Sequence, residues 1–248
     1  MRIFTLALVA LSALSSSSAL AAPSIELKYF DIKGKAETAR IIFALAGKEY
    51  KDTRYEITPG TMKAPEFIAA KEAGDLDINL GRAPLLLVDG KAIGQSAAIE
   101  RYLAKQFGLM GSSDIEAAQI DCVAEHCRDV KDAQMKKGFS AFSRDKSEEE
   151  KLEARKEWFE TEFPAMLEKM EKAVQITSEK DGYAVGETNS YADVVIFSLL
   201  RDCGMDCSDK EDTLKAAKAC TLLMAIADRI ADDSKVSKWV EERPKSMF

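Results

Sequence analysis

The stretch from Ile25 to Gly47 limits the possible folds of this chain more than any other, because it changes from a strand pattern to a helix pattern. Apolar and charged residues alternate up to Tyr29, which is the two-residue period of a half-buried β-strand. After Gly34 apolar residues recur at helical spacing, and Gly47 follows where the helix should end. The Tyr29 phenol is therefore predicted at the carboxyl end of a first strand, where open α/β sheets bind ligands. The alternative is that Tyr29 is only a half-buried strand aromatic.

The following residues continue this α/β pattern. Asp89-Gly90 is a strong hairpin signal between two short strands. The predicted elements are a strand over 49–57, a helix over 64–73, strands over 85–88 and 91–93, and a helix over 97–105. Their order predicts a mixed four-stranded sheet with helices on both faces.

Two positions in this part are candidates for binding. The bond between Ala83 and Pro84 is a candidate cis bond, which would expose the backbone of Ala83 as a pairing edge. Ser96 is predicted at the start of the last helix, where it either caps the helix or offers its hydroxyl and free backbone N–H groups to an anion. These two interpretations are compatible.

Beyond a break at residues 108–113, every predicted element is a helix. A capping box runs from Ser190 to Asp193, just before a strongly apolar stretch. The predicted helices cover 114–138, 147–177, 190–203, 212–230 and 235–242. The predicted fold is therefore an α/β domain, residues 24–106, followed by an all-helical domain, residues 114–248.

The first 21 residues have the pattern of a secretory signal peptide. Arg2 precedes an apolar stretch from Ile3 to Leu14, and Ala19-Leu20-Ala21 is a small-x-small cleavage pattern. The apolar stretch is too short to span a bilayer. We expect cleavage near Ala21 and entry into the secretory pathway. The alternative is an uncleaved leader on a cytoplasmic protein.

Charge, cysteine and histidine content exclude several classes of function. The chain of 248 residues has a net charge of −7 and no basic tract, so a nucleic-acid partner is not expected. No stretch after the leader is apolar enough for a membrane span. The five cysteines leave at least one unpaired, while Cys203 and Cys207 either form a local bridge or stay reduced. The single histidine, His126, rules out a three-histidine metal site, and no metal is expected.

Several short motifs, in order along the chain, resemble those of cytosolic-type glutathione transferases. The similarity is to the tyrosine-using sigma, alpha and mu classes, and mostly to sigma. The carriers are Leu27-Lys28-Tyr29-Phe30, Gly34-Lys35-Ala36-Glu37, Ala83-Pro84-Leu85-Leu86, Gln95-Ser96-Ala97-Ala98-Ile99, Ser190-Tyr191-Ala192-Asp193, Val236-Ser237-Lys238-Trp239 and Arg243-Pro244. The resemblance implies a thioredoxin-like first domain with a βαβ-α-ββα order and a helical second domain.

The resemblance also implies a site for glutathione as a co-substrate, with no further cofactor. In such enzymes the tyrosine at the position of Tyr29 donates a hydrogen bond to the glutathione sulfur, and Asp129 of the partner subunit reaches the γ-glutamyl amine. This implies a homodimer. Lys35 replaces a usual arginine and keeps its charge but not its planar fork. The matching glutathione-binding positions are Tyr29, Lys35, Phe67, Lys71, Arg82, Ala83, Pro84, Gln95, Ser96 and Asp129.

Two classes of function remain for such a chain. The first is an enzyme that conjugates glutathione to hydrophobic electrophiles, with peroxidase or isomerase activity as variants. The electrophile is then expected beside Phe30, Ile32 and the helix over 114–138. The second is a non-catalytic relative that carries ligands or serves a structural role. Joint retention of Tyr29, Gln95, Ser96 and Asp129 favours the enzyme.

Overall fold

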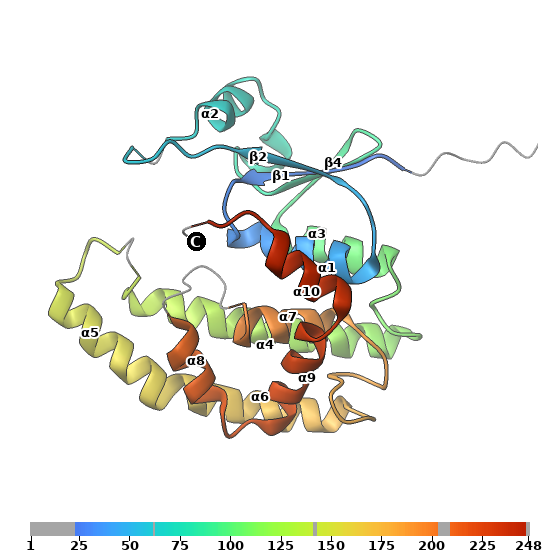
Figure 1. The fold of residues 1–248 in the computed structure, drawn as a ribbon, viewed down its shortest axis with the longest axis vertical. Helices are drawn as coiled ribbons and strands as arrows, with labels where there is room; N and C mark the ends of the chain where they lie inside the picture. The colour runs from blue at the N-terminus through green and yellow to red at the C-terminus, as the bar shows by residue number, and fades with distance from the viewer. Residues whose placement is uncertain (1–22, 62, 141–142, 203–208, 247–248) are drawn as a thin grey trace, which may run out of the picture.

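The computed structural model describes residues 23–61, 63–140, 143–202 and 209–246. The predicted signal peptide, residues 1–21, lies outside the described residues, as do Cys203 and Cys207. Figure 1 shows two parts: the upper part contains the sheet together with its own helices, and the lower part is a larger group of helices. This confirms the predicted order of an α/β unit followed by a helical unit.

The sheet has four strands in the order β2-β1-β3-β4. β1 pairs with β2 in parallel, and the other two pairings are antiparallel. The strands are β1 (Ile25–Phe30), β2 (Lys51–Tyr55), β3 (Leu85–Val88) and β4 (Lys91–Gly94). The predicted mixed sheet is confirmed. The central strands β1 and β3 carry the apolar side chains that the sheet buries, including Leu27 opposite Leu86.

Helices cover both faces of this sheet, as predicted. α1 (Glu37–Ala46) and α3 (Ser96–Gln106) pack against each other on one face, and α2 (Pro65–Glu72) lies on the other. Two short 3-10 segments, η1 (Gly34–Ala36) and η2 (Asp77–Asn79), precede α1 and β3. α1 ends at Gly47, which adopts the left-handed conformation expected of a terminating glycine.

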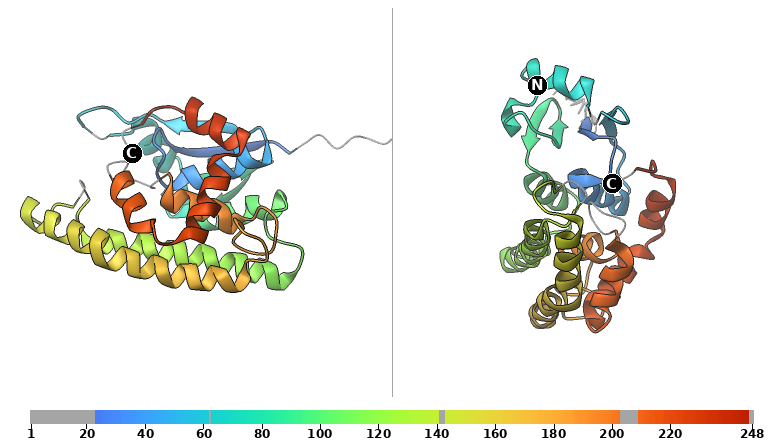
Figure 2. Two further views of the ribbon diagram at one scale, coloured as in Figure 1. Left: turned by 60° about the horizontal axis from the view of Figure 1, so that its bottom comes forward. Right: turned by 90° about the vertical axis from the view of Figure 1, so that its left-hand side faces the viewer.

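The second half is helical throughout its named elements. In Figure 2, α4 and the run from α5 to α6 extend side by side along one edge of the molecule. Every residue of α7 is buried, and the capping box at its start is present, as predicted. The elements are α4 (Asp114–Lys137), α5 (Glu148–Glu157), the π-helical η3 (Trp158–Glu162), α6 (Phe163–Thr177), α7 (Tyr191–Leu200), α8 (Lys210–Ala217), α9 (Thr221–Ala231) and α10 (Ser234–Glu242).

The prediction of one helix over 212–230 was wrong, because two helices, α8 and α9, occupy this region. The chain leaves helical geometry at Cys220, the N-cap of α9, whose side chain is buried. The break allows α8 to pack on α6 and η3 while α9 packs along α7. Apolar periodicity on both sides of the break looks continuous in the sequence, so the pattern alone did not reveal it.

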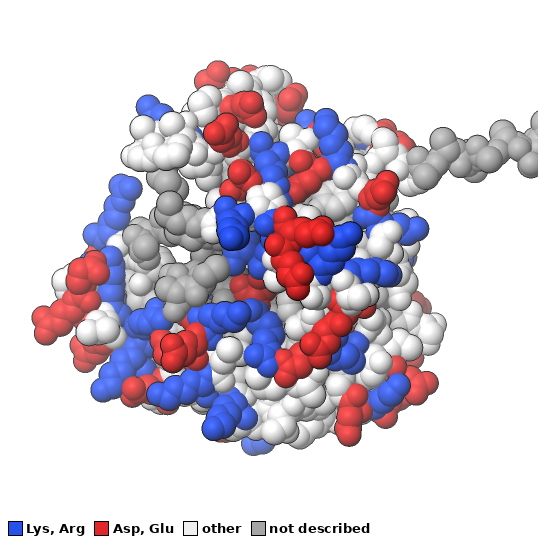
Figure 3. Space-filling view, in the orientation of Figure 1, with Lys and Arg blue, Asp and Glu red and all other residues white. Residues whose placement is uncertain are grey.

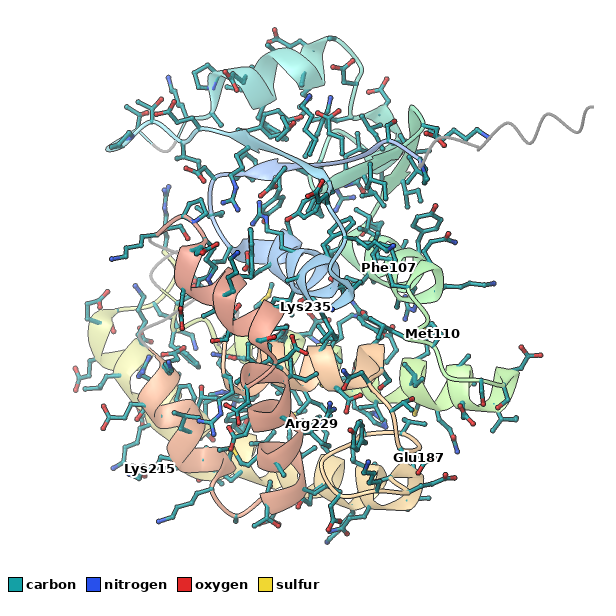
Figure 4. All side chains as sticks on the ribbon, turned by 45° about the vertical axis from the view of Figure 1, so that its right-hand side comes forward. Phe107, Met110, Glu187, Lys215, Arg229 and Lys235 are labelled. Atoms are coloured by element: carbon teal, nitrogen blue, oxygen red, sulfur yellow. The ribbon has the colours of Figure 1, made fainter. Side chains whose placement is uncertain are left out.

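The two halves share one apolar core. α1 packs against α7 and α10, and α3 packs against α7. Phe107 and Met110 lie at the junction in Figure 4, and the Phe107 ring centroid is 5.7 Å from that of Phe43. Acidic and basic side chains lie next to one another over α10 in Figure 3. Among the described residues, no helix combines the length and apolarity needed to cross a bilayer.

Candidate functional site

Tyr29 lies at the carboxyl end of β1, and the turn that follows folds back onto its hydroxyl. Tyr29 is 6% exposed, and its Oη accepts a hydrogen bond from the Lys35 N–H at 3.0 Å. Gly34 makes this close approach possible, since a Cβ there would lie 2.6 Å from Oη. Because Oη accepts the Lys35 N–H, its own hydrogen can point to another group.

Burial keeps this phenol protonated. Desolvation raises the pKa of Tyr29 above its usual value, although the Lys35 N–H and the charge of Arg40 oppose the rise. At neutral pH Tyr29 is therefore a hydrogen-bond donor rather than a phenolate. The Lys35 side chain is exposed, so its contribution inside the chain comes from its backbone.

Arg40 supports the same turn from inside the protein, and the sequence reasoning missed it. Its side chain is fully buried, and its Nη1 donates to the carbonyl oxygens of Ile32 at 2.8 Å and Lys33 at 3.4 Å. Its guanidinium carbon lies 6.0 Å from the centroid of the Tyr29 ring. Arg40 also pairs with Glu37 and Asp52. Its position on the buried stripe of α1 was the only signal in the sequence.

The second group of candidate residues lies at the corner before β3 and at the start of α3. The Ala83–Pro84 bond is cis, and Pro84 is buried. Gln95, not Ser96, is the N-cap of α3, which corrects the prediction. The reason is that the Gln95 carbonyl already accepts the Ile99 N–H at 3.0 Å, so Ser96 is the first helical residue. Gln95 has a φ of +66° and an exposed side chain.

Asn79 joins these two segments, and the sequence reasoning missed it as well. It is 3% exposed, and its Nδ2 donates to the carbonyl oxygens of Arg82 and Pro84, both at 2.9 Å. Its Oδ1 accepts the Gln95 N–H at 3.0 Å. Gly94 allows this packing, because a Cβ there would lie 2.6 Å from the Asn79 Cβ. Nothing in the sequence distinguished Asn79 from other polar residues of its loop.

The residues predicted to hold the glycyl end lie on and beside α2. The Phe67 ring packs on the sheet, with its centroid 4.8 Å from that of Phe30 and 5.7 Å from that of Tyr55. Lys71 is exposed, and its stem crosses Gly81, where a Cβ would lie 2.9 Å from the lysine Cε. Because Arg82 is the exposed neighbour of Gly81, both cations lie at this edge of the domain.

α4 carries Asp129, the remaining candidate, in the helical half. Asp129 is exposed, and His126 is half-buried with its Nε2 3.4 Å from the Sγ of Cys122. Glu125, one turn earlier on α4, is neutralised within the chain by ion pairs with Arg101 and Arg128. The described residues contain no group of three histidine, cysteine, aspartate or glutamate side chains arranged to hold a metal ion.

Comparison with known proteins agrees with this architecture over both halves. Residues 25–105 match the family model "Glutathione S-transferase, N-terminal domain", and residues 133–243 match "Glutathione S-transferase, C-terminal domain". Glutathione S-transferase 1 of Ascaris suum is 31% identical over 231 residues, which cover 91% of this chain and 100% of that protein. The chain belongs to the glutathione S-transferase family.

Two further relatives are similar to this chain over almost its whole length. S-crystallin 4 of Enteroctopus dofleini is 28% identical over 233 residues, 91% of this chain and 100% of the crystallin. The crystal structure of monomeric Na-GST-3 from the hookworm Necator americanus superposes with a TM-score of 0.71 at 27% identity, covering 91% and 100% of the two chains. The present chain is a glutathione transferase with a thioredoxin-like first domain, and its substrates are glutathione and an electrophile.

Proposed function

We propose that this transferase activates the glutathione thiol through Tyr29 and conjugates it to hydrophobic electrophiles. The observation that carries the proposal is the state of the phenol. It is buried and protonated, and it accepts the Lys35 N–H, so its own hydrogen is available to an anion at the end of β1. A thiolate bound there receives that hydrogen bond.

The energy required is within reach of one hydrogen bond. A free thiol has a pKa of about 8.5, and each unit by which it falls needs about 1.4 kcal/mol of preferential stabilisation of the thiolate. A hydrogen bond to a charged acceptor contributes roughly 1.5–3 kcal/mol. A shift of about one to two units by Tyr29 is therefore reasonable, and it brings the thiol pKa close to neutral pH.

The reaction then needs no further group from the protein. The thiol proton passes to the solvent, while Tyr29 keeps its own proton and stabilises the thiolate. A sulfur lone pair forms the new S–C bond, and the bond to the leaving group breaks with its electron pair, as for a halide. Phe30 and Ile32, both half-buried beside Tyr29, belong to the surface that would meet the apolar electrophile.

The peptide part of glutathione is assigned to the remaining candidates. The Ala83 backbone pairs with the cysteinyl part after the turn at Pro84. Gln95 and Ser96 hold the γ-glutamyl end at the amino terminus of α3, where free N–H groups and the helix dipole favour a carboxylate. Two exposed cations near α2, Lys71 and Arg82, suit the glycyl carboxylate, and Phe67 packs beside them.

A two-fold dimer completes this assignment. Ile78 and Leu80 expose 63% and 74% of their surface on the loop before β3, and Asp129 is exposed on α4. In a dimer Asp129 of the partner subunit meets the γ-glutamyl amine. Sedimentation gives the oligomeric state, and Asp129→Ala should raise the KM for glutathione. A monomer with an unchanged KM for Asp129→Ala contradicts the dimer.

The leader is proposed to direct the enzyme to the secretory pathway. Sequencing the amino terminus of the mature protein tests this proposal.

One experiment separates this function from a non-catalytic role, which the similarity to S-crystallin 4 makes the second candidate. Binding to immobilised glutathione and turnover of a generic aryl halide are measured for the wild type and for Tyr29→Phe. Tyr29→Phe should keep its affinity for glutathione and lose about ten- to hundredfold in kcat, because one charge-assisted hydrogen bond is removed. A wild-type protein that neither binds immobilised glutathione nor turns over the aryl halide would contradict the enzymatic proposal. A peroxide and an isomerisable substrate in parallel assays identify the variant activities.

A further inference from the structure

A chain of buried and partly buried side chains, joined by hydrogen bonds and ion pairs, links the last helix to the turn that follows Tyr29. We call it the α10 latch, and it consists of Glu37 and Arg40 on α1, and Trp239 and Arg243 at the end of α10. Arg40 is the member of the latch that contacts the turn, and it donates to the Ile32 and Lys33 carbonyl oxygens. Those two carbonyls belong to the turn whose Lys35 N–H reaches the Tyr29 hydroxyl.

Glu37 is the centre of the latch. Its Oε2 lies 3.2 Å from Arg40 Nη1, and its Oε1 accepts hydrogen bonds from Trp239 Nε1 and Arg243 Nη1, both at 2.8 Å. Burial by itself raises the pKa of Glu37, but the charges of Arg40 and Arg243 outweigh it and hold that pKa below its usual value. Glu37 is therefore an ionised, buried carboxylate whose partners come from α1 and α10.

The carboxyl-terminal side of the latch is itself anchored. Arg243 Nη2 donates to Asp202 Oδ1 at 2.5 Å, which ties α10 to the segment after α7. The Lys33 N–H donates to Ser246 Oγ at 3.3 Å, so the residues after α10 also contact the turn directly. At the other end of α10, Lys235 Nζ donates to the Leu45 carbonyl oxygen at 3.3 Å. Figure 4 shows Lys235 on α10 beside α1.

We infer that Arg243 and Trp239 are positioning residues for Tyr29. They fix Glu37, Glu37 fixes Arg40, and Arg40 holds the turn that presents the Lys35 N–H to Oη. This arrangement aims the phenol hydrogen at the thiolate, so the docking of α10 sets how strongly the thiol pKa is lowered. The inference rests on the proposed role of Tyr29 as thiol activator. It assigns part of the activation to residues more than 200 positions away in the chain.

The test compares Arg243→Gln and Trp239→Phe with a matched control, Arg229→Gln. Arg229 pairs with the buried Asp193 at 3.0 Å in the helical half, and its contacts do not include the turn. It lies on α9, well below α1 in Figure 4. The measurements are the pKa of enzyme-bound glutathione from the pH profile of kcat/KM and from thiolate absorbance, the KM for glutathione, and the melting temperature.

The latch variants should raise the bound thiol pKa by about half a unit to one unit, which is a three- to tenfold fall in turnover below that pKa. Their KM for glutathione should stay within about twofold. Arg229→Gln should lower the melting temperature and leave the thiol pKa unchanged. Arg243→Lys should recover part of the shift, because it keeps the charge. If Arg243→Gln does not fold, Trp239→Phe still removes one donor to Glu37 while keeping an aromatic ring.

Unchanged thiol pKa values in both latch variants, with lowered melting temperatures, would mean that the latch only stabilises the fold, and would overturn the inference. Tyr29→Phe separates this failure from failure of the proposed function. If Tyr29→Phe does not raise the thiol pKa, Tyr29 is not the activator. If it does, the double variant Tyr29→Phe/Arg243→Gln should show no further rise, since the latch acts through Tyr29.

Discussion

Two parts of the proposed glutathione site are held in place by different kinds of interaction. The turn after β1 is held by buried ions, Arg40 and Glu37, whose partners include residues of α10. The corner that joins Pro84 to Gln95 is held by one neutral amide, Asn79, and all its partners lie within the first domain. The first arrangement depends on docking of the helical half, while the second is local.

This difference suggests that binding of the glutathione peptide and activation of its thiol depend on different parts of the structure. The amide network needs no ionised group, so it should keep its geometry across the pH range and at high salt. The ionic network needs a charged Glu37 and a docked α10. We therefore expect binding of the peptide to follow the integrity of the Asn79 corner, and thiol activation to follow the integrity of the α10 latch.

The largest expected effect on stability comes from Glu37→Ala, which removes the carboxylate that Arg40 and Arg243 share as a counter-ion. Breaking a buried ion pair by deleting one partner costs about 3–5 kcal/mol of unfolding free energy. Denaturant unfolding of wild type, Glu37→Ala and Glu37→Gln measures it. Glu37→Gln should lose less, since an amide retains an acceptor for Trp239. A loss below about 1 kcal/mol for the alanine variant contradicts a latch held by ions.

Asn79→Ala should cost about 2–4 kcal/mol of unfolding free energy, because two carbonyls and one N–H lose a buried partner. Its KM for glutathione should rise, while the pKa of the bound thiol stays at the wild-type value. Asn79→Asp is a useful companion, since it keeps the acceptor for Gln95 but turns a carboxylate oxygen toward two carbonyls. A shifted thiol pKa with unchanged KM would reverse the assignment of the two regions.

Acid should weaken the latch and spare the corner. Because the pKa of Glu37 is lowered by folding, its contribution to stability is fully present above the unfolded pKa of about 4.3. That contribution is lost as the pH falls through the lower folded pKa. The difference in unfolding free energy between wild type and Glu37→Gln should therefore shrink in acid. The difference between wild type and Asn79→Ala should stay constant, and a parallel decline of both would refute the contrast.

Lys35→Arg is expected to have the smallest effect. The Lys35 side chain is exposed, and the backbone N–H that reaches Tyr29 is the same in both residues. Stability should change by no more than about 0.5 kcal/mol. Arginine offers a planar fork to a carboxylate, so the KM for glutathione should fall modestly while the thiol pKa does not move. Steady-state kinetics over a series of glutathione concentrations detects this.

Much of the fold could be predicted because its signals are local. The alternation before Tyr29, the hairpin at Asp89-Gly90 and the capping box from Ser190 to Asp193 each involve residues within a few positions of one another. Such patterns reflect backbone geometry and short-range hydrogen bonds, which depend little on the rest of the chain. The start of α3 was misplaced by one residue, because the backbone hydrogen bond from Ile99 to Gln95 decides it. The break between α8 and α9 was missed, because packing rather than periodicity decides it.

The sequence by itself determined that a tyrosine lies near the carboxyl end of the first strand, and that a glycine turn and a helix follow it. Only the tertiary structure decided which polar side chains hold that turn and the Asn79 corner. Arg243 and Glu37 are 206 positions apart, and Asn79 and Gln95 are 16 apart. A buried polar group is stable only with its partners in place, and those partners are chosen by how the helices pack. No local pattern in the chain carries that information.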